Sequence, residues 1–284
     1  MKKITFLGLI VFGLMACETK LDLSEVGGRT RLVVNSLIND QDKIEIQISK
    51  TIPLGSAAAV EFVNNAVVVV RDENGNAAGF SYNVGTDKYE NPTFRAVAGR
   101  YYSVSVKAPG FDEVFAEMVM PEKASKSPST WKDSTDFDSS GFPTGTLNIT
   151  INDNGSESNY YRISLFYYDD ITATWNTLLP VTRDAAIENE AIVSDNGSWV
   201  FSDRTFNGNQ KNIAFITPFG YALGTPKYLA VTESLNDPYF KYFQSIENYK
   251  AGAGVFGEAT PIYSNIRNGV GIWAGSSIVR DTIR

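Results

Sequence analysis

"DKIEIQISK", residues 42–50, alternates between apolar and polar side chains. Successive side chains of a β-strand point to opposite faces, so the three isoleucines fall on one side and the intervening Glu45 and Gln47 on the other. The pattern predicts a strand with one buried face. It also sets the period of two to look for in the rest of the chain.

Short apolar runs also stand on both sides of predicted turns. In "VVVVRDENGNAAGFSY", residues 67–82, Asn74-Gly75 separates two apolar runs, which is typical of a tight hairpin. Short apolar runs of this kind continue as far as Pro121. They are punctuated by turn residues and show no amphipathic helix. We therefore predict a mainly β protein that begins with an immunoglobulin-like β-sandwich over residues 31–121.

Residues 122–145 are rich in Ser, Pro, Thr, Lys and Asp, and we interpret them as a segment that connects two domains. Alternating stretches resume after it, so residues 146–284 are expected to form a second, antiparallel β-rich domain. That domain contains one predicted helix near the C-terminus, "DPYFKYFQSIENYKA", residues 237–251. Asp237 stands at its expected N-cap, and its aromatic stripe is typical of core packing.

The N-terminus has the pattern of a targeting signal. Two lysines precede an apolar run at residues 4–15, which is shorter than the roughly 20 residues of a membrane-spanning helix. "LMAC", residues 14–17, then places the only cysteine of the chain as in a bacterial lipoprotein signal. We predict that residues 1–16 are a signal peptide and that Cys17 is lipidated with acyl chains such as palmitate. Residues 17–30 would tether the fold to a membrane.

Composition argues against several classes of function. The chain has 25 basic and 32 acidic residues, and removal of residues 1–16 takes away Lys2 and Lys3 only, which leaves 23 basic residues and a net charge of −9. Nucleic acid needs a basic surface, so we expect no nucleic-acid partner. The chain has no histidine, which removes the Ser-His-Asp relay and the commonest zinc ligand. We expect no enzyme activity, no cofactor and no metal site.

Three conspicuous motifs have simpler interpretations than a site. "GAGVFG", residues 252–257, matches G-x-G-x-x-G, but it follows the predicted helix, whereas a dinucleotide loop opens one. Asp169-Asp170 could supply two carboxylates for glycoside hydrolysis, yet it follows a strand and is interpreted as a solvated turn. "DENGN", residues 72–76, resembles part of a calcium loop, and the predicted hairpin accounts for it.

Aromatic residues are the remaining source of binding function. The chain has 14 Tyr, 17 Phe and 4 Trp, enough for a carbohydrate-stacking platform or a protein interface. Most of them must lie in the core. The sequence does not distinguish the exposed ones, so the ligand-binding residues are unknown from the sequence.

Segments across the chain resemble one family of Bacteroidota lipoproteins, domain of unknown function 4249. They are "RLVVNSLIND", "FSDRTFNG", the predicted helix and, most specifically, "PIYSNIRNGVGIWAG" at residues 261–275. Taken by itself, the last segment predicts turns at Ser264-Asn265 and at residues 268–271. We expect it to close the second domain, with Ile272 and Trp273 in the core of that domain.

The resemblance implies a location and a binding partner for the protein, and it implies no catalytic residue. Members of the family resemble outer-membrane lipoproteins that are encoded beside TonB-dependent receptors, which implies an accessory partner in ligand capture or uptake. Glu18 and Asp22 are similar to acidic surface-export signals and imply display at the cell surface, although Lys20 and Leu21 interrupt them and leave the periplasmic leaflet open. The alternative is an independent surface binder of glycans or peptides, and a hydrolase is the third possibility.

Overall fold

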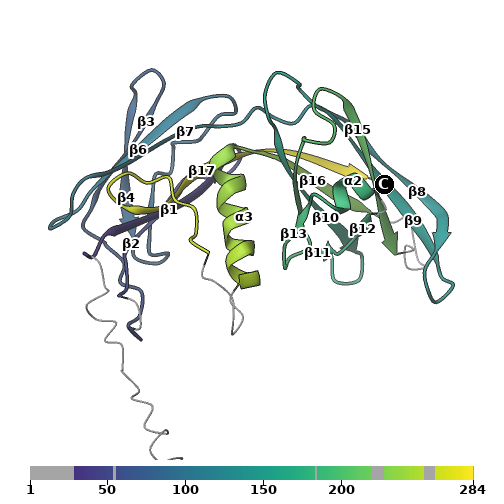
Figure 1. Cartoon of the computed structure of the whole chain (residues 1–284), viewed down its shortest axis with the longest axis horizontal. Helices are drawn as coiled ribbons and strands as arrows, with labels where there is room; N and C mark the ends of the chain where they lie inside the picture. The colour runs from purple at the N-terminus through teal and green to yellow at the C-terminus, as the bar shows by residue number, and fades with distance from the viewer. Residues whose placement is uncertain (1–28, 54–55, 183, 219–226, 253–259, 284) are drawn as a thin grey trace, which may run out of the picture.

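A computed structural model describes residues 29–53, 56–182, 184–218, 227–252 and 260–283. These residues form one sheet of 13 strands, one sheet of four strands, and the helix α3, Asp237–Gly252. Figure 1 shows an arch in which β1–β7 make an N-terminal limb and β8–β16 make a C-terminal limb. Strand β17, Val270–Ile283, runs between the limbs, and α3 descends beside it. The prediction of a mainly β chain with a short helix near its C-terminal end is confirmed, and the immunoglobulin-like arrangement stays a prediction.

The N-terminal limb is a single sheet that curls around its own core. Its strands follow the order β17-β1-β2-β5-β4-β3-β6-β7. The far edge returns toward the first strand, because Phe115 of β7 and Arg267, just before β17, exchange backbone hydrogen bonds of 3.2 and 2.8 Å. Ile44, Ile46 and Ile48 are all buried in this core, as the alternation predicts. The strands are β1 Leu32–Asn39, β2 Glu45–Lys50, β3 Val67–Asp72, β4 Ala77–Asn83, β5 Lys88–Glu90, β6 Tyr101–Lys107 and β7 Val114–Val119.

The turn between β3 and β4 is built by its acidic residue. The carboxylate of Asp72 accepts hydrogen bonds of 2.9 Å from the backbone nitrogens of Asn74 and Asn76. Gly75 adopts a φ of 80°, a left-handed conformation that glycine reaches without steric cost. The hairpin predicted at residues 72–76 is therefore confirmed, and the turn itself engages the carboxylate.

The C-terminal limb is a sandwich of two sheets. Strands β13-β14-β10-β16-β17 of the large sheet face the small sheet β12-β15-β9-β8. Alternate residues of β10, Tyr161, Ile163 and Leu165, are buried in the core between them. The elements are β8 Lys126–Phe137, β9 Pro143–Asn152, β10 Tyr160–Asp169, β11 Thr174–Leu178, β12 Val181–Thr182, the four-residue helix α2 Ala185–Glu188, β13 Ile192–Val193, β14 Trp199–Ser202, β15 Gln210–Pro218 and β16 Tyr228–Leu235.

Much of the segment predicted to connect two domains, residues 122–145, is itself a strand. β8 pairs with β9 from Lys126 to Phe137, with irregularities in register before Thr130 and before Asp136. These irregularities break the period of two, and so the alternation that marks the other strands is missing here. The segment joins the sandwich as its edge strand.

Helix α3 begins one residue away from the predicted cap. The side-chain oxygen of Asn236 accepts from the nitrogen of Tyr239 at 3.1 Å, so Asn236 is the N-cap and Asp237 is the first helical residue. Only Tyr239 is fully buried, and Phe240 and Phe243 are half-buried against the large sheet. The aromatic stripe is therefore packing, as predicted, but it covers the sheet incompletely.

Strand β17 belongs to both limbs. Up to Ser276 it pairs in parallel with β1, and from Ser276 to Ile283 it pairs antiparallel with β16. A single 14-residue strand thus continues the sheet of one limb into the other. The two limbs have separate cores but share this strand.

The segment before and within β17 is shaped by close backbone contacts. Gly271 has a φ of 117°, and a Cβ atom there would lie 2.1 Å from the carbonyl oxygen of Val34. Asn265 accepts from the nitrogen of Trp273 and donates to its carbonyl oxygen, at 2.9 and 2.8 Å. Trp273 lies in the N-terminal core, so the expectation that it belongs to the second domain is wrong. Neighbouring side chains of β17 point to opposite faces, and Ile272 packs under α3 on the other side.

The predicted signal peptide, Cys17 and most of the tether lie outside the described residues. None of the helices within the described ranges combines the length and apolar character that a bilayer crossing requires.

Candidate functional site

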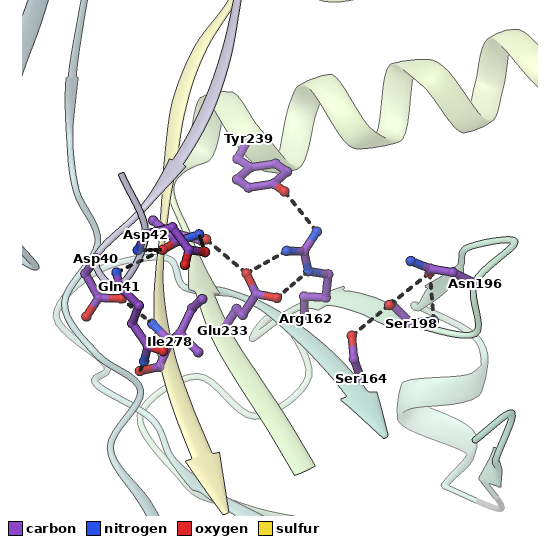
Figure 2. Close-up of polar contacts among 12 residues, drawn as sticks. Asp40, Gln41, Asp42, Arg162, Ser164, Asn196, Ser198, Glu233, Tyr239 and Ile278 are labelled. Atoms are coloured by element: carbon purple, nitrogen blue, oxygen red, sulfur yellow. Dashed lines mark hydrogen bonds and ion pairs between the residues drawn. The ribbon is translucent and has the colours of Figure 1, made fainter. Parts of the chain in front are cut away.

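A buried ion pair lies where α3 meets the large sheet (Figure 2). Arg162 of β10 and Glu233 of β16 are direct cross-strand partners. Nε and Nη2 of the guanidinium donate to the two carboxylate oxygens at 2.8 and 2.6 Å, and Nη1 donates to the Tyr239 hydroxyl at 2.9 Å. Such a two-pronged pair is geometrically specific. It therefore fixes the first turn of α3 against the sheet.

The electrostatics of this cluster favour a structural role. Burial raises the pKa of Tyr239, so its phenol stays protonated. Burial lowers the pKa of Arg162, but the neighbouring Tyr239 and Glu233 outweigh that effect and leave the pKa raised. Glu233 also accepts from Ser276 Oγ at 2.9 Å, and Ser276 is the residue of β17 at which strand pairing changes from β1 to β16. Both carboxylate oxygens are engaged, so Glu233 is a poor candidate for a general base.

A short chain of hydroxyl groups lies on the same face of the sheet. Ser164 Oγ and Ser198 Oγ are 2.7 Å apart, and Ser198 Oγ donates to the side-chain oxygen of Asn196 at 3.0 Å. A serine nucleophile needs a base beside it, and an amide oxygen is not one. Figure 2 shows this chain next to the ion pair. Among the described residues, this chain of hydroxyl groups makes contacts that order the turn before β14.

A third set of contacts braces the two limbs. The backbone nitrogen of Ile278, in the second half of β17, donates to Asp40 Oδ1 at 2.9 Å. Gln41 Nε2 donates to the carbonyl oxygen of Ile278 at 3.1 Å, and Lys123 lies 2.9 Å from Asp40. The turn after β1 is thereby attached to β17 beyond the point where β1 stops pairing with it. The junction is held by strand pairing, by the ion pair and by this turn.

Exposed aromatic side chains gather on two hairpins of the C-terminal limb. Among the described residues, five aromatic side chains are exposed, and Tyr249 of α3 is the only one of them outside these hairpins. The hairpin β8–β9 carries Phe137 and Phe142, and the hairpin β10–β11 carries Tyr167 and Trp175. Both hairpins turn at the lower edge of the limb in Figure 1. We call these four residues the aromatic end surface.

The tip of the β10–β11 hairpin is also ordered by polar contacts. Tyr168 and Trp175 pack edge to face at 5.2 Å, and the Lys227 ammonium lies 4.8 Å from the Tyr168 ring centre. Lys227 pairs with Asp170 at 2.6 Å, and Asp169 accepts from the nitrogen of Ile171 at 2.8 Å. Asp169-Asp170 is therefore a solvated turn, as predicted, and its two carboxylates have separate partners.

The remaining motifs and clusters of the described residues do not assemble a site. Gly252 ends α3, and residues 253–257 of the glycine-rich motif lie outside the described residues. The described part of the chain contains no group of three or more His, Cys, Asp or Glu that could hold a metal ion. A hollow of about 410 Å³ lies where residue 30 leads into β1, and the ion-paired Lys50 and Glu61 are part of its wall.

The sequence identified neither the ion pair between Arg162 and Glu233 nor the aromatic end surface. Arg162 falls on the polar face of its strand, but its partner lies 71 positions later and no local pattern links them. Phe137 and Phe142 lie in the segment interpreted as a connection. The stretch "DFDSSGFP" that contains them has the Asp and Gly of a tight turn, and this signal could have located the hairpin.

The fold defines a mainly β, two-sheet protein in which two limbs share one strand. The family model described as Domain of unknown function (DUF4249) matches residues 18–282, and the chain belongs to that family. No protein among those with curated functions matches it. Among solved structures, the chain is similar to a mutant of Salmonella alpha-2-macroglobulin, with 10% identity and a TM-score of 0.25. That match covers 90% of this chain and 15% of the Salmonella protein.

Proposed function

We propose that this chain is a non-catalytic outer-membrane lipoprotein, displayed at the cell surface, that assists a TonB-dependent receptor in ligand capture or uptake. The observation that carries the proposal is the aromatic end surface. Tyr, Trp and Phe are enriched at protein interfaces, and four of the five exposed aromatic side chains in the described residues lie on two hairpins of the C-terminal limb.

The charged groups support binding over catalysis. Glu233, a buried carboxylate at the junction, has both oxygens engaged, and the conspicuous Asp169-Asp170 pair is divided between a turn and a lysine. These carboxylates stabilise the scaffold. The scaffold in turn holds the hairpins in fixed positions.

The membrane part of the proposal rests on the sequence. A charged start, a short apolar run and a cysteine after a small residue are the features of a lipoprotein signal. Anchoring by two or more acyl chains is long-lived, because each buried methylene contributes about 0.8 kcal/mol. Cys17→Ala should release the protein from the membrane fraction, and intact mass of the wild type should show the added lipid.

The receptor part is tested by purification from membranes. The full chain with a C-terminal tag is extracted in mild detergent, and the proteins that accompany it are identified by mass spectrometry. We expect a TonB-dependent receptor in near-equal amount. Recovery of the chain alone, or with proteins of other classes only, would overturn the proposal.

A second candidate function is independent binding of glycans or peptides. The observation that favours it is the ring pair Tyr168 and Trp175, which stands at a hairpin tip beside Lys227. Sugar rings stack on exposed aromatic side chains, and Trp175 is the exposed member of this pair. Retardation of the purified protein in polysaccharide gels, lost in Trp175→Ala, would support this function over the first.

A further inference from the structure

We infer that the tip of the β8–β9 hairpin, residues 137–142, inserts into a protein partner whose surface offers an apolar recess bordered by Lys or Arg. The inference rests on the proposed function and specifies the interface of that function. It is carried by the exposure, order, position and charge of this one tip.

The tip presents two phenyl rings to solvent. Phe137 and Phe142 are 66% and 67% exposed, and they flank the turn from either side. Burying a phenylalanine side chain at an interface removes apolar surface from water and so stabilises the association. Two such rings on one turn are a concentrated apolar contact on an otherwise polar segment.

The turn that carries the rings is already ordered. The carboxylate of Asp138 accepts from the nitrogens of Ser140 and Phe142 at 2.8 and 2.9 Å. Asp138 and Phe142 also pair through their backbones at 2.8 Å, and Gly141 takes the left-handed φ of 81° that closes the turn. A loop fixed in advance loses little conformational entropy on binding, which favours affinity.

The tip also projects from the sandwich. The Trp131 ring packs on Tyr228 at 5.7 Å, and Tyr228 opposes Tyr167 at the end of the β10–β16 pairing. β8 pairs with β9 as far as Phe137 and Pro143, whereas β9 pairs with β15 only as far as Thr144 and Pro218, so the turn at residues 138–142 lies beyond the last pairs of its sheet. A partner can therefore receive the tip without contacting the limb on all sides.

Charge selects among partners. Residues 132–146 contain one lysine and three aspartates, so the hairpin end is net acidic. A protein recess bordered by Lys or Arg complements this charge and speeds association. Anionic lipid headgroups would repel it, which disfavours insertion of the tip into a membrane.

The test compares variants of the full, tagged chain in the detergent extraction described above. Phe137→Ser with Phe142→Ser should lower receptor recovery at least about tenfold, the size of a hot-spot loss. Val84→Ser is the matched control, because Val84 is equally apolar in character, 82% exposed and located in the N-terminal limb. The Val84→Ser protein should recover as much receptor as the wild type does. Thermal unfolding should be the same for all three proteins, because the substituted side chains are exposed.

Salt and lipid controls separate the possible partners. Raising the ionic strength from about 0.1 to about 1 M shortens the Debye length from about 10 to about 3 Å. The wild-type chain should then recover less receptor. Undiminished recovery of the double variant would overturn the inference while leaving the proposed function intact. Failure of the wild type to recover a receptor would overturn both. Binding of the Cys17→Ala chain to phosphatidylcholine vesicles, lost in the double variant while receptor recovery persists, would reassign the tip to the membrane and overturn the inference.

Discussion

Glu233→Gln removes the charge that balances Arg162 and keeps the size of the side chain. Glu233 is 6% exposed, and it receives two hydrogen bonds from the guanidinium. The pKa of Arg162 stays raised by its neighbours, so the guanidinium remains charged in the folded protein. The substitution therefore leaves a cation in a largely buried site opposite a neutral amide.

The expected loss of stability follows from this burial. Breaking a buried pair by removing one partner costs about 3–5 kcal/mol. The Arg162 side chain keeps 23% of its exposure, so water still reaches it and the loss should be near the lower end, about 3 kcal/mol. Arg162→Met should cost at least as much, since it leaves the less exposed carboxylate unpaired. The double variant removes both charges, and its loss should be smaller than the sum of the single losses by at least about 2 kcal/mol.

Urea unfolding of the four proteins, followed by tryptophan fluorescence, gives the double-mutant cycle. The Cys17→Ala chain is the common background, so that no lipid can be attached at this position. A loss below about 1 kcal/mol for Glu233→Gln, or losses that simply add, would refute the view that this pair holds α3 to the sheet. Far-ultraviolet circular dichroism should show that the helix is retained in each folded variant.

Three further predictions concern other parts of the junction and the N-terminal limb. Trp273→Ala should lower the free energy of unfolding by about 3–5 kcal/mol in urea titrations, because a fully buried ring leaves a cavity. Asn236→Ala should cost at least about 1 kcal/mol in the same titration through loss of the helix cap, whereas Asn236→Asp should keep the cap but lose the hydrogen bond from Nδ2 to the Val119 carbonyl oxygen. A hydrogen bond from Lys43 lowers the pKa of Glu90 from 4.5 to about 2, so the stability it contributes is present above about pH 4.5 and is lost as pH falls toward 2. NMR titration of Glu90 checks the value, and Lys43→Met should return the pKa toward 4.5.

Local patterns account for the parts of the fold that could be predicted. The isoleucines of β2 and the Asn-Gly of the β3–β4 turn act within a few residues, so each leaves a readable signal. The helix could be placed to within one residue for the same reason. The two hydrophobic cores divide between Met120 and Ala124, although Ile266 and Trp273 near the C-terminus also belong to the first core.

Pairing between distant segments was the part that could not be predicted. β17 lies beside β1 in parallel although more than 230 positions separate Val33 from Val270, and no periodicity encodes that choice. The need for glycine at position 271 follows only from this pairing, because the backbone of Val34 in β1 leaves no room for a side chain there. The exposed aromatic rings could not be predicted for a related reason, because exposure depends on the whole fold. Phe137 is of a residue type that is usually found in the core.

The parallel pairing of β1 with β17 determines how the molecule would carry mechanical load. A pull on the N-terminal end, resisted by the C-terminal limb, draws β1 and β17 in opposite directions along their length. The seven residue pairs from Val33 and Val270 to Asn39 and Ser276 then bear the force together, in shear, instead of opening one after another. An attachment before β1, as proposed for Cys17, would thus load all seven of these residue pairs at once.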